Sequence, residues 1–303
     1  MSAHGGDVVS AGRALGVDPA TILDLSASLN PLAPDVTALA PTLLGHLRRY
    51  VDDVEVAEAT SRLARVVGVE ADRLVLTNGA AEAIALVAAA QPRGWVEPPE
   101  FSLYERHLAV LQPDAPRWRS NPNNPVGHLA APEERAGVWD ESFFPLAAGT
   151  WTRGDDDAYR IGSLTKLWAC PGLRLGYVIA PSPAAALALA ARQPAWSVNG
   201  LALALLAPLL DRTDLAAWAA GIAVLRREVA RLFARFDVVE SAANWVLVHG
   251  AGHLRTPLAR QGVLVRDCAS FGLAGTIRVA VPAEAGLERL ATALVAVQLT
   301  AGS

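Results

Sequence analysis

The segment Arg73-Leu-Val-Leu-Thr-Asn-Gly-Ala-Ala-Glu82 joins a short apolar run to an alanine-rich stretch through an Asn-Gly pair. Residues 73–77 combine β-branched and aliphatic side chains, which is typical of a buried strand. Residues 80–90 consist largely of alanine, the strongest helix former. Because Gly79 can adopt a positive φ without steric strain, the chain can turn sharply between the two. The segment therefore predicts a strand, a tight turn and a helix in direct succession.

The same alternation continues toward the C-terminus. A helix is predicted near residues 103–111. Further strands are predicted at residues 94–97, 117–120, 137–143, 158–163 and 176–179. Strands that alternate with helices favour a mainly parallel, doubly wound sheet, so we expect this part of the chain to form a large α/β domain.

The two ends of the chain complete the predicted organisation. Helices are predicted at residues 7–15, within 41–67, and at 214–236, 254–261 and 283–299, with strands at 244–248, 263–267 and 276–281. The last of these elements indicate a small α+β domain. We therefore divide the chain into an N-terminal segment (1–40) that completes the small domain and the site, a large domain (41–212) and a C-terminal small domain (213–303).

Composition excludes several classes of protein. Of the 303 residues, 52% are hydrophobic and 18% are charged, which excludes a disordered chain and predicts a large core. A net charge of -4 lacks the basic excess of a nucleic-acid binder. The longest apolar stretch, residues 200–210, is too short to cross the ~30 Å hydrocarbon core of a bilayer. Two cysteines are too few for a disulfide framework, so we expect a cytoplasmic protein.

Three motifs in the α/β part place polar groups where such folds bind ligands. In Thr77-Asn-Gly-Ala-Ala-Glu82, the free N–H groups of a helix start can hold a phosphate. Asn121-Pro-Asn-Asn-Pro-Val-Gly127 predicts an irregular loop that presents the amide of Asn124. Asp140 follows a short apolar run, which places a carboxylate at the C-terminal end of a strand. Each motif alone is equally explained by a tight turn, a structural loop or a helix cap.

The fourth motif contains a residue type that occurs once. The chain has 26 lysines and arginines, and Lys166 in Ser163-Leu-Thr-Lys166 is the single lysine among them. An amine can condense with an aldehyde, whereas a guanidinium cannot at neutral pH. A chain that uses arginine everywhere else indicates by this exception that Lys166 serves covalent chemistry rather than surface charge.

Together the four motifs match the needs of pyridoxal 5′-phosphate. This cofactor requires an amine for its aldehyde, donors for its phosphate, an anion at its pyridine nitrogen and a donor near its phenolic oxygen. These needs are met in order by Lys166, by residues 79–82 with Ser163 and Arg174, by Asp140, and by Asn124. We predict no metal site.

At this point the chain resembles the fold-type I pyridoxal-phosphate enzymes of the aminotransferase class I/II superfamily. Within it, the likeness is strongest to the threonine-phosphate decarboxylases of cobalamin biosynthesis and the histidinol-phosphate aminotransferases. It rests on the four motifs together with Pro171-Gly-Leu-Arg-Leu-Gly-Tyr177, His4-Gly-Gly6, Leu23-Asp-Leu-Ser-Ala-Ser-Leu-Asn-Pro-Leu32, Arg49-Tyr50, Pro194-Ala-Trp-Ser-Val-Asn199, Val265-Arg-Asp-Cys268 and Ile277-Arg-Val279. The resemblance implies a large domain with a mainly parallel sheet and a small α+β domain.

The resemblance also implies roles for individual residues. Lys166 would bind the cofactor covalently, Asp140 would pair with its pyridinium and Asn124 with its phenolic oxygen. The cofactor phosphate would be held by Gly79, Ala80, Ala81, Ser163 and Arg174, and Phe101 would stack on the ring. Tyr50 would reach the cofactor of a neighbouring subunit, which implies a homodimer with shared sites.

The substrate would be held by cations from the small domain. Arg278 would clamp its α-carboxylate in a bidentate fork. Arg266, His4 and Asn30 would bind the phosphate of the substrate itself. The implied substrate is therefore a small phosphorylated amino acid or amine.

Three features depart from the family pattern. Phe143 stands where these aminotransferases usually carry a tyrosine, and Ser28 replaces an asparagine that commonly contacts substrate phosphate. The chain is also shortened between Tyr104 and Asp140. Between Gly127 and Gly137 the connection is too short for a crossover helix, which with its loops takes at least ~10–12 residues.

Two reactions and one non-enzymatic role remain open. If Arg266 and Arg278 hold the substrate so that its carboxylate bond stands perpendicular to the ring, L-threonine O-3-phosphate is decarboxylated. If the Cα–H bond is perpendicular instead, Lys166 moves that proton and the result is transamination, as with histidinol phosphate. The shortened large domain also suggests a weakly active scaffold or partner protein, which retention of Lys166 argues against.

Overall fold

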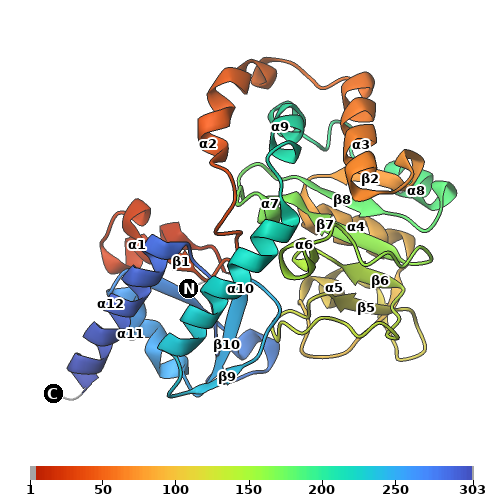
Figure 1. The fold of residues 1–303 in the computed structure, drawn as a ribbon. Coiled ribbons are helices and arrows are strands. Elements are labelled where there is room, and N and C mark those ends of the chain that lie inside the picture. The colour runs from red at the N-terminus through yellow and green to blue at the C-terminus, as the bar shows by residue number, and fades with distance from the viewer. Residues whose placement is uncertain (1–4, 302–303) are drawn as a thin grey trace.

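The computed structural model describes residues 5–301. The chain forms two sheets with covering helices, one from its middle and one from its two ends (Figure 1). The first strand of the chain lies beside a strand near residue 263 in the second sheet. Both ends of the chain therefore contribute to the same side of the site described below.

The larger sheet has seven strands. They are β2 (Leu74–Thr77), β3 (Arg93–Val96), β4 (Val110–Leu111), β5 (Arg117–Ser120), β6 (Val138–Asp140), β7 (Tyr159–Ser163) and β8 (Gly176–Ile179). Their order is β2-β8-β7-β6-β5-β3-β4. Every neighbouring pair is parallel except the two that β8 makes with β2 and β7. The predicted mainly parallel sheet is confirmed.

Helices cover both faces of this sheet. The helices between β1 and α10, most of which pack on this sheet, are α2 (Val36–Leu39), α3 (Asp53–Val67), α4 (Gly79–Ala90), α5 (Leu103–His107), α6 (Phe144–Ala148), α7 (Leu164–Leu167), α8 (Pro183–Ala190) and α9 (Gly200–Leu210). Along β2, Leu74 and Leu76 pack into one buried apolar cluster and Val75 into another. Because side chains alternate along a strand, the two clusters lie on opposite faces, which explains the continuous apolar run in the sequence.

The smaller sheet has five strands in the order β1-β11-β12-β10-β9. They are β1 (Leu23–Leu25), β9 (Asp237–Val239), β10 (Trp245–His249), β11 (Val263–Asp267) and β12 (Ile277–Ala280). β1 pairs parallel with β11, and the other pairs are antiparallel. The patterns predicted three of these strands and missed β1 and β9.

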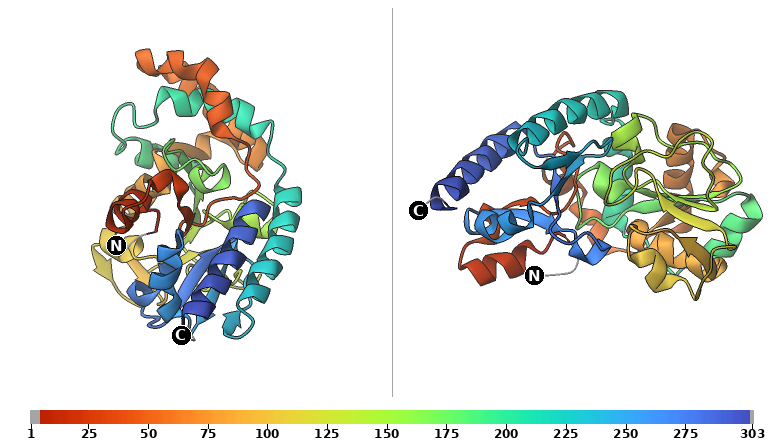
Figure 2. Two further views of the ribbon diagram at one scale, coloured as in Figure 1. Left: turned by 90° about the vertical axis from the view of Figure 1, so that its left-hand side faces the viewer. Right: turned by 90° about the horizontal axis from the view of Figure 1, so that it is seen from below.

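Four longer helices accompany the smaller sheet. They are α1 (Val8–Leu15), α10 (Leu215–Leu232), α11 (Arg255–Arg260) and α12 (Glu284–Ala301). Helices α10 and α12 pack against each other (Figure 2). Since α10 also packs on α6, it joins the two halves of the molecule, and the division at residues 40 and 212 stays a prediction. Among the helices within residues 5–301, none is both long and apolar enough to cross a membrane.

Two stretches that were predicted to be α-helical, near residues 103–111 and within residues 41–67, differ in part from the prediction. The helix predicted near residues 103–111 ends at His107, and Val110–Leu111 forms the edge strand β4 instead. Leu108 is extended, with φ -70° and ψ 130°, and β4 then pairs with β3. Parts of the chain also form short 3-10 helices: η1 (Pro19–Thr21), η2 (Ala40–Arg48), η3 (Ala71–Arg73), η4 (Gly252–Leu254) and η5 (Ala269–Phe271).

The connection between β5 and β6 contains no helix, as its length predicts. Arg153, from the loop after α6, lies across this connection and donates hydrogen bonds to the backbone oxygens of Ala131 (3.0 Å), Pro132 (3.0 Å) and Glu134 (2.7 Å). Its guanidinium carbon is 4.5 Å from the ring centre of buried Trp139. One arginine therefore ties down the loop that replaces a crossover helix.

Candidate active site

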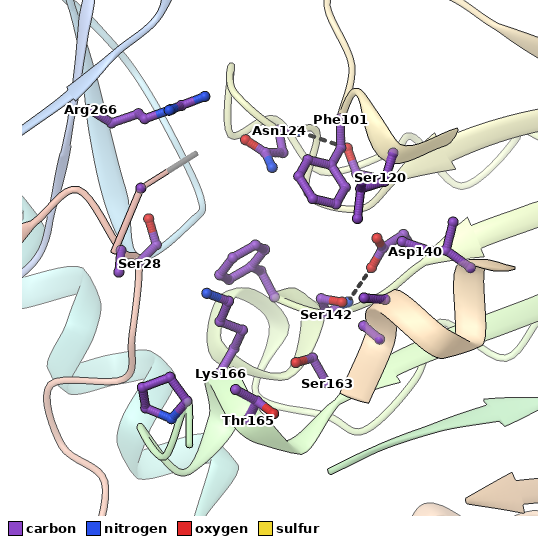
Figure 3. A pocket seen from close by; sticks show the side chains of 18 of the residues that line it. Ser28, Phe101, Ser120, Asn124, Asp140, Ser142, Ser163, Thr165, Lys166 and Arg266 are labelled. Carbon is purple, nitrogen blue, oxygen red and sulfur yellow. Dashed lines mark hydrogen bonds between the residues drawn. The ribbon is translucent and has the colours of Figure 1, made fainter. Parts of the chain in front are cut away.

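A cavity of about 390 Å³ lies between the two sheets. Ser120, Asp140 and Ser163, which all line it, are the last residues of the neighbouring strands β5, β6 and β7. Arg266 of β11 and Arg278 of β12 line it from the smaller sheet. The carboxyl ends of parallel strands are where open α/β sheets bind ligands. Figure 3 shows Lys166 and Arg266 reaching into this space, with Asp140 on the opposite wall.

Lys166 sits on α7, the short helix that directly follows β7. Within the part of the chain that the structure describes, no hydrogen-bond partner faces its Nζ. Burial, followed by the positive charges of Arg278 and Arg174, lowers the pKa of Lys166 to about 8. The amine is therefore neutral more often than an exposed lysine, and only a neutral amine can attack an aldehyde.

Asp140 is buried and held in one orientation by two donors. The Tyr104 hydroxyl donates to Oδ2 at 2.7 Å, and the backbone N–H of Ser142 donates to Oδ1 at 2.9 Å. Burial raises the pKa of Asp140, and the hydrogen bonds from Ser142 and Tyr104 oppose that rise. A carboxylate fixed in this way can face a cationic ring nitrogen.

Asn124 and Arg278 contact each other across the boundary between the sheets. Arg278 Nη1 donates to Asn124 Oδ1, and the backbone N–H of Asn124 donates to Ser120 Oγ at 2.7 Å. The Arg278 guanidinium lies over the ring of Trp245, 4.9 Å from its centre, and burial lowers its pKa to about 10. Its Nε is buried and has no partner among residues 5–301.

The turn between β2 and α4 brings Arg174 against the start of the helix. Gly79 has a φ of +75°, and a Cβ added there would lie 2.5 Å from Arg174 Nη2. Arg174 Nη2 donates to the backbone oxygen of Asn78 at 3.4 Å. Ala80 and Ala81 line the cavity beside it. Gly79 is therefore required for both its conformation and its lack of a side chain, and the turn presents N–H groups and a guanidinium together.

Arg266 and Arg278 face each other as register partners of β11 and β12. Arg266 Nη2 donates to Ser270 Oγ at 2.9 Å, and its guanidinium lies 5.4 Å from the ring centre of Phe271. On the same side of the cavity as Arg266, the hydroxyl of Ser28 is buried and lacks a partner in the described chain (Figure 3). This end of the cavity therefore offers two cations and a free hydroxyl to an anionic ligand.

Of the remaining predicted site residues, one lines the cavity and two do not. Phe101 lines the cavity. Tyr50 is 75% exposed, stacks near Trp196 at 4.7 Å between ring centres, and does not line the cavity of its own chain. Asn30 does not line it either, because its amide donates to the backbone oxygen of Leu167 and its Oδ1 accepts from the backbone of residue 32. His4 lies outside the described residues.

Sequence reasoning missed several polar groups of the site. Ser120, Ser142 and Thr165 line the cavity, and Tyr104 orients Asp140. A serine directly before the Asn121 motif and another two residues after Asp140 were visible in the sequence. Their positions at strand ends could have identified them, but their hydrogen bonds depend on which strands are neighbours.

The donor set fits pyridoxal 5′-phosphate. An unpartnered amine, a buried carboxylate, an amide and a turn rich in N–H groups with an arginine beside it all border one cavity. Its volume suits a cofactor with a small substrate. Lys166 would hold the aldehyde carbon, Asp140 the pyridine nitrogen, Asn124 the phenolic oxygen, and residues 79–81 with Arg174 the phosphate.

Comparison with known proteins agrees with this chemistry. Residues 118–294 match the family Aminotransferase class I and II. The threonine-phosphate decarboxylase of Salmonella typhimurium is 31% identical over 97% of this chain and 96% of that protein. Histidinol-phosphate aminotransferase 1 of Dechloromonas aromatica is 26% identical over 96% and 94%.

Solved structures support the fold. The histidinol-phosphate aminotransferase from Sinorhizobium meliloti in complex with pyridoxal-5′-phosphate superposes with a TM-score of 0.81, at 18% identity, over 98% of this chain and 95% of that one. The likeness therefore covers both sheets, including the shortened region. By sequence match and by fold, the chain belongs to the aminotransferase class I and II family.

Proposed function

We propose that this protein is a pyridoxal-phosphate-dependent enzyme that decarboxylates L-threonine O-3-phosphate. The observation that carries the proposal is the position of the single lysine, which lines one cavity together with Asp140 and two arginines of the small sheet. The 31% identity to a threonine-phosphate decarboxylase over 97% of this chain supports the choice of substrate. The two buried, unpaired cysteines support a reducing compartment such as the cytoplasm.

The residues divide the work. The bound cofactor supplies an aldehyde for the substrate amine and a ring that accepts electrons from its Cα. Lys166 would hold the cofactor through its amine until the substrate amine takes its place. Asp140 keeps the ring nitrogen protonated, since a buried carboxylate beside it favours the cation. Arg278 grips the carboxylate and Arg266 the phosphate.

The two arginines also orient the reacting bond. Both project from neighbouring strands in register, so they hold both anionic ends of a substrate from the same side. If the arginines present the carboxylate bond of the substrate for cleavage, carbon dioxide would leave, and Lys166 would be placed to return a proton to Cα. If they present the Cα–H bond instead, Lys166 would accept that proton. Transamination of a substrate such as histidinol phosphate is therefore the second candidate, and the 26% identical aminotransferase supports it.

Two assays on one preparation test the choice. With L-threonine O-3-phosphate we expect carbon dioxide release and no glutamate. Glutamate formation from 2-oxoglutarate with histidinol phosphate, without carbon dioxide release, would support the transaminase instead. Purified wild-type protein should be yellow, and Lys166→Ala should lose the absorbance of the imine. A colourless wild type that ignores added cofactor would support a scaffold role.

We also propose that two copies share their active sites. Tyr50 and Trp196 form an exposed aromatic pair, and Leu44, Leu47 and Val54, which are close to Tyr50 in the sequence, are also exposed. An apolar patch of this kind is typical of a protein interface. A second copy seated there would bring Tyr50 toward the cofactor of its partner.

A further inference from the structure

A second buried carboxylate lies behind the wall of the cavity. Glu100, in the segment between β3 and α5, is 9% exposed and does not line the cavity. None of the steps described above uses it. Burying a carboxylate is costly unless hydrogen bonds compensate, so its partners indicate what it does.

Four donors converge on this carboxylate. Oε1 accepts from the backbone N–H of Ser120 at 2.9 Å and from the amide of Asn123 at 3.0 Å. Oε2 accepts from the hydroxyl of Ser120 at 2.6 Å and from the backbone N–H of Phe101 at 3.1 Å. An ionised carboxylate offers four acceptor sites and no donor, so the donor set matches the charged form.

These partners connect Glu100 to two residues of the cavity wall. Ser120 Oγ donates to Glu100 and accepts the backbone N–H of Asn124 at 2.7 Å. The hydroxyl therefore links Glu100 to the start of the loop that carries the Asn124 amide. Phe101 is held through its own backbone N–H. One buried side chain thus restrains parts of the wall that lie on different elements.

We propose that Glu100 is a positioning residue, which locks Ser120 and Phe101 and so places Asn124 and the Phe101 ring for the cofactor. The inference rests on the proposed function, because it assumes that a cofactor contacts these residues. Burial raises the pKa of Glu100 to about 7, and the hydrogen bonds from Ser120 and Phe101 oppose that rise. Removing a donor or the carboxylate therefore changes the hydrogen bonds that hold Ser120 and Phe101.

Glutamine is the most informative replacement, because it has the same shape and one donor end. With its NH₂ at the Oε2 position, it faces the N–H of Phe101. With its NH₂ at the Oε1 position, it faces the N–H of Ser120. A backbone donor opposes a side-chain donor in either orientation, and a buried donor without an acceptor is destabilising. Glu100→Gln should therefore loosen the wall without creating a void.

Glu97→Gln is the matched control. Glu97 lies just upstream, its side chain is 55% exposed, and it pairs with Arg117 at 2.6 Å outside the cavity. The Glu97→Gln substitution replaces the same type of side chain in the same part of the chain, but it leaves the hydrogen bonds to Ser120 and Phe101 unchanged. The two variants thus separate the hydrogen bonds of Glu100 from a general change in charge.

The experiment measures the dissociation constant for pyridoxal 5′-phosphate by titrating apo-protein, and the visible circular dichroism of the bound cofactor. We expect Glu100→Gln to weaken binding roughly tenfold and to reduce the dichroism at saturation, as lost hydrogen bonds to a charged group would. Glu97→Gln should stay within about twofold of wild type. A Glu100→Gln protein with wild-type affinity and dichroism would overturn the proposal, even if its melting temperature fell.

A second variant keeps the test decisive if Glu100→Gln does not fold. Ser120→Ala removes the hydroxyl that links Glu100 to Asn124 and leaves the carboxylate in place. Weaker binding with a wild-type melting temperature supports the proposal, and unchanged binding contradicts it. Failure of wild-type protein to bind the cofactor would count against the proposed function, whereas wild-type binding with no effect of either variant would count against this inference alone.

Discussion

Lys166 shows how the surroundings of one residue set its reactivity. The side chain is an ordinary primary amine, and it stands out in the sequence because it is the one lysine of the chain. The fold buries it and places Arg278 and Arg174 nearby, so that its pKa falls to about 8. The same residue on the surface would be almost entirely protonated at neutral pH.

This lowered pKa predicts how fast the apo-protein captures its cofactor. The neutral amine is the reactive form, so the rate of capture should rise with pH and level off above about pH 8. The measurement follows visible absorbance after mixing apo-protein with pyridoxal 5′-phosphate at a series of pH values. A reaction of the cofactor with a small free amine corrects for the titration of the cofactor.

Arg278→Gln provides the control for the cause of the shift. It removes one of the positive charges that lower the pKa of Lys166, so the midpoint of the rate profile should move to higher pH. A wild-type rate that keeps rising to pH 10 would show that Lys166 is not in the described environment.

Arg278 is predicted to recognise a carboxylate. The side chain is buried and lines the cavity, so Arg278→Ala removes a charged partner that water cannot replace. We expect the transition state to lose about 2–4 kcal/mol of stabilisation, so that kcat/KM falls roughly 30- to 1,000-fold. Steady-state kinetics with L-threonine O-3-phosphate measures this loss.

Two comparisons make the Arg278 result specific. Arg231→Ala removes an exposed arginine, whose partner is Glu228, and should leave the kinetics unchanged. An O-phosphorylated amino alcohol, which lacks the carboxylate, should inhibit wild type and Arg278→Ala equally well. If Arg278→Ala lost as much affinity for this inhibitor as for the substrate, Arg278 would hold a part of the substrate other than its carboxylate.

Most elements of the fold could be predicted from local patterns. Strands β5, β8 and β11 match the predicted ranges residue for residue, because each is a buried apolar or alternating run between turn residues. The helix predicted near residues 103–111 was wrong in its second half, where pairing with β3 forms an edge strand. A tertiary pairing outweighed local helical preference at that point.

The connection between β5 and β6 illustrates how a shortened element is compensated. A parallel pair usually has a helix in its connection, and here Arg153 fills that role with a stack on Trp139 and hydrogen bonds to three backbone oxygens. The short connection between Gly127 and Gly137 predicted that no helix forms there. The residue that replaces it comes from a different loop and could not be found by pattern.

Arg153→Ala should therefore destabilise the fold. Three backbone oxygens lose a charged donor and Trp139 loses its cover, so the free energy of unfolding should fall by about 2–4 kcal/mol. Arg153→Lys should restore less than half of this loss, because an ammonium cannot reproduce the planar fork. Urea denaturation measures both variants.

Arg135→Ala is the matched control for Arg153. Arg135 is exposed and donates to the backbone oxygens of Pro132 and Glu134, two of the same acceptors. An exposed arginine of this kind should contribute less than about 0.5 kcal/mol. Equal losses for the two variants would show that the loop does not depend on the buried arginine.

The arrangement of the complete chain predicts shared active sites. Tyr50 is exposed and lies outside the cavity of its own chain, whereas Lys166 lies inside it. If two copies exchange Tyr50, a mixed dimer of Lys166→Ala and Tyr50→Ala has one complete site. Co-expression should therefore restore activity that neither variant shows alone.

Sedimentation and activity together check this prediction. Each variant should sediment at twice the mass of the chain, and the mixed preparation should reach a substantial fraction of wild-type activity per site. A mixture no more active than its two components would show that Tyr50 serves only its own subunit or no active site at all.

Local chemistry and periodicity were enough to predict the alternating strands and helices, the loop without a crossover helix and the single amine suited to covalent chemistry. Each of these depends on residues close together in the chain. The partners of that amine depend on contacts between distant segments. Arg278 reaches Asn124 across 154 positions, and Tyr104 reaches Asp140 across 36. Burial, which shifts the pKa values of Lys166 and Asp140, arises only when the two sheets close around the cavity, because desolvation is a property of the packed chain.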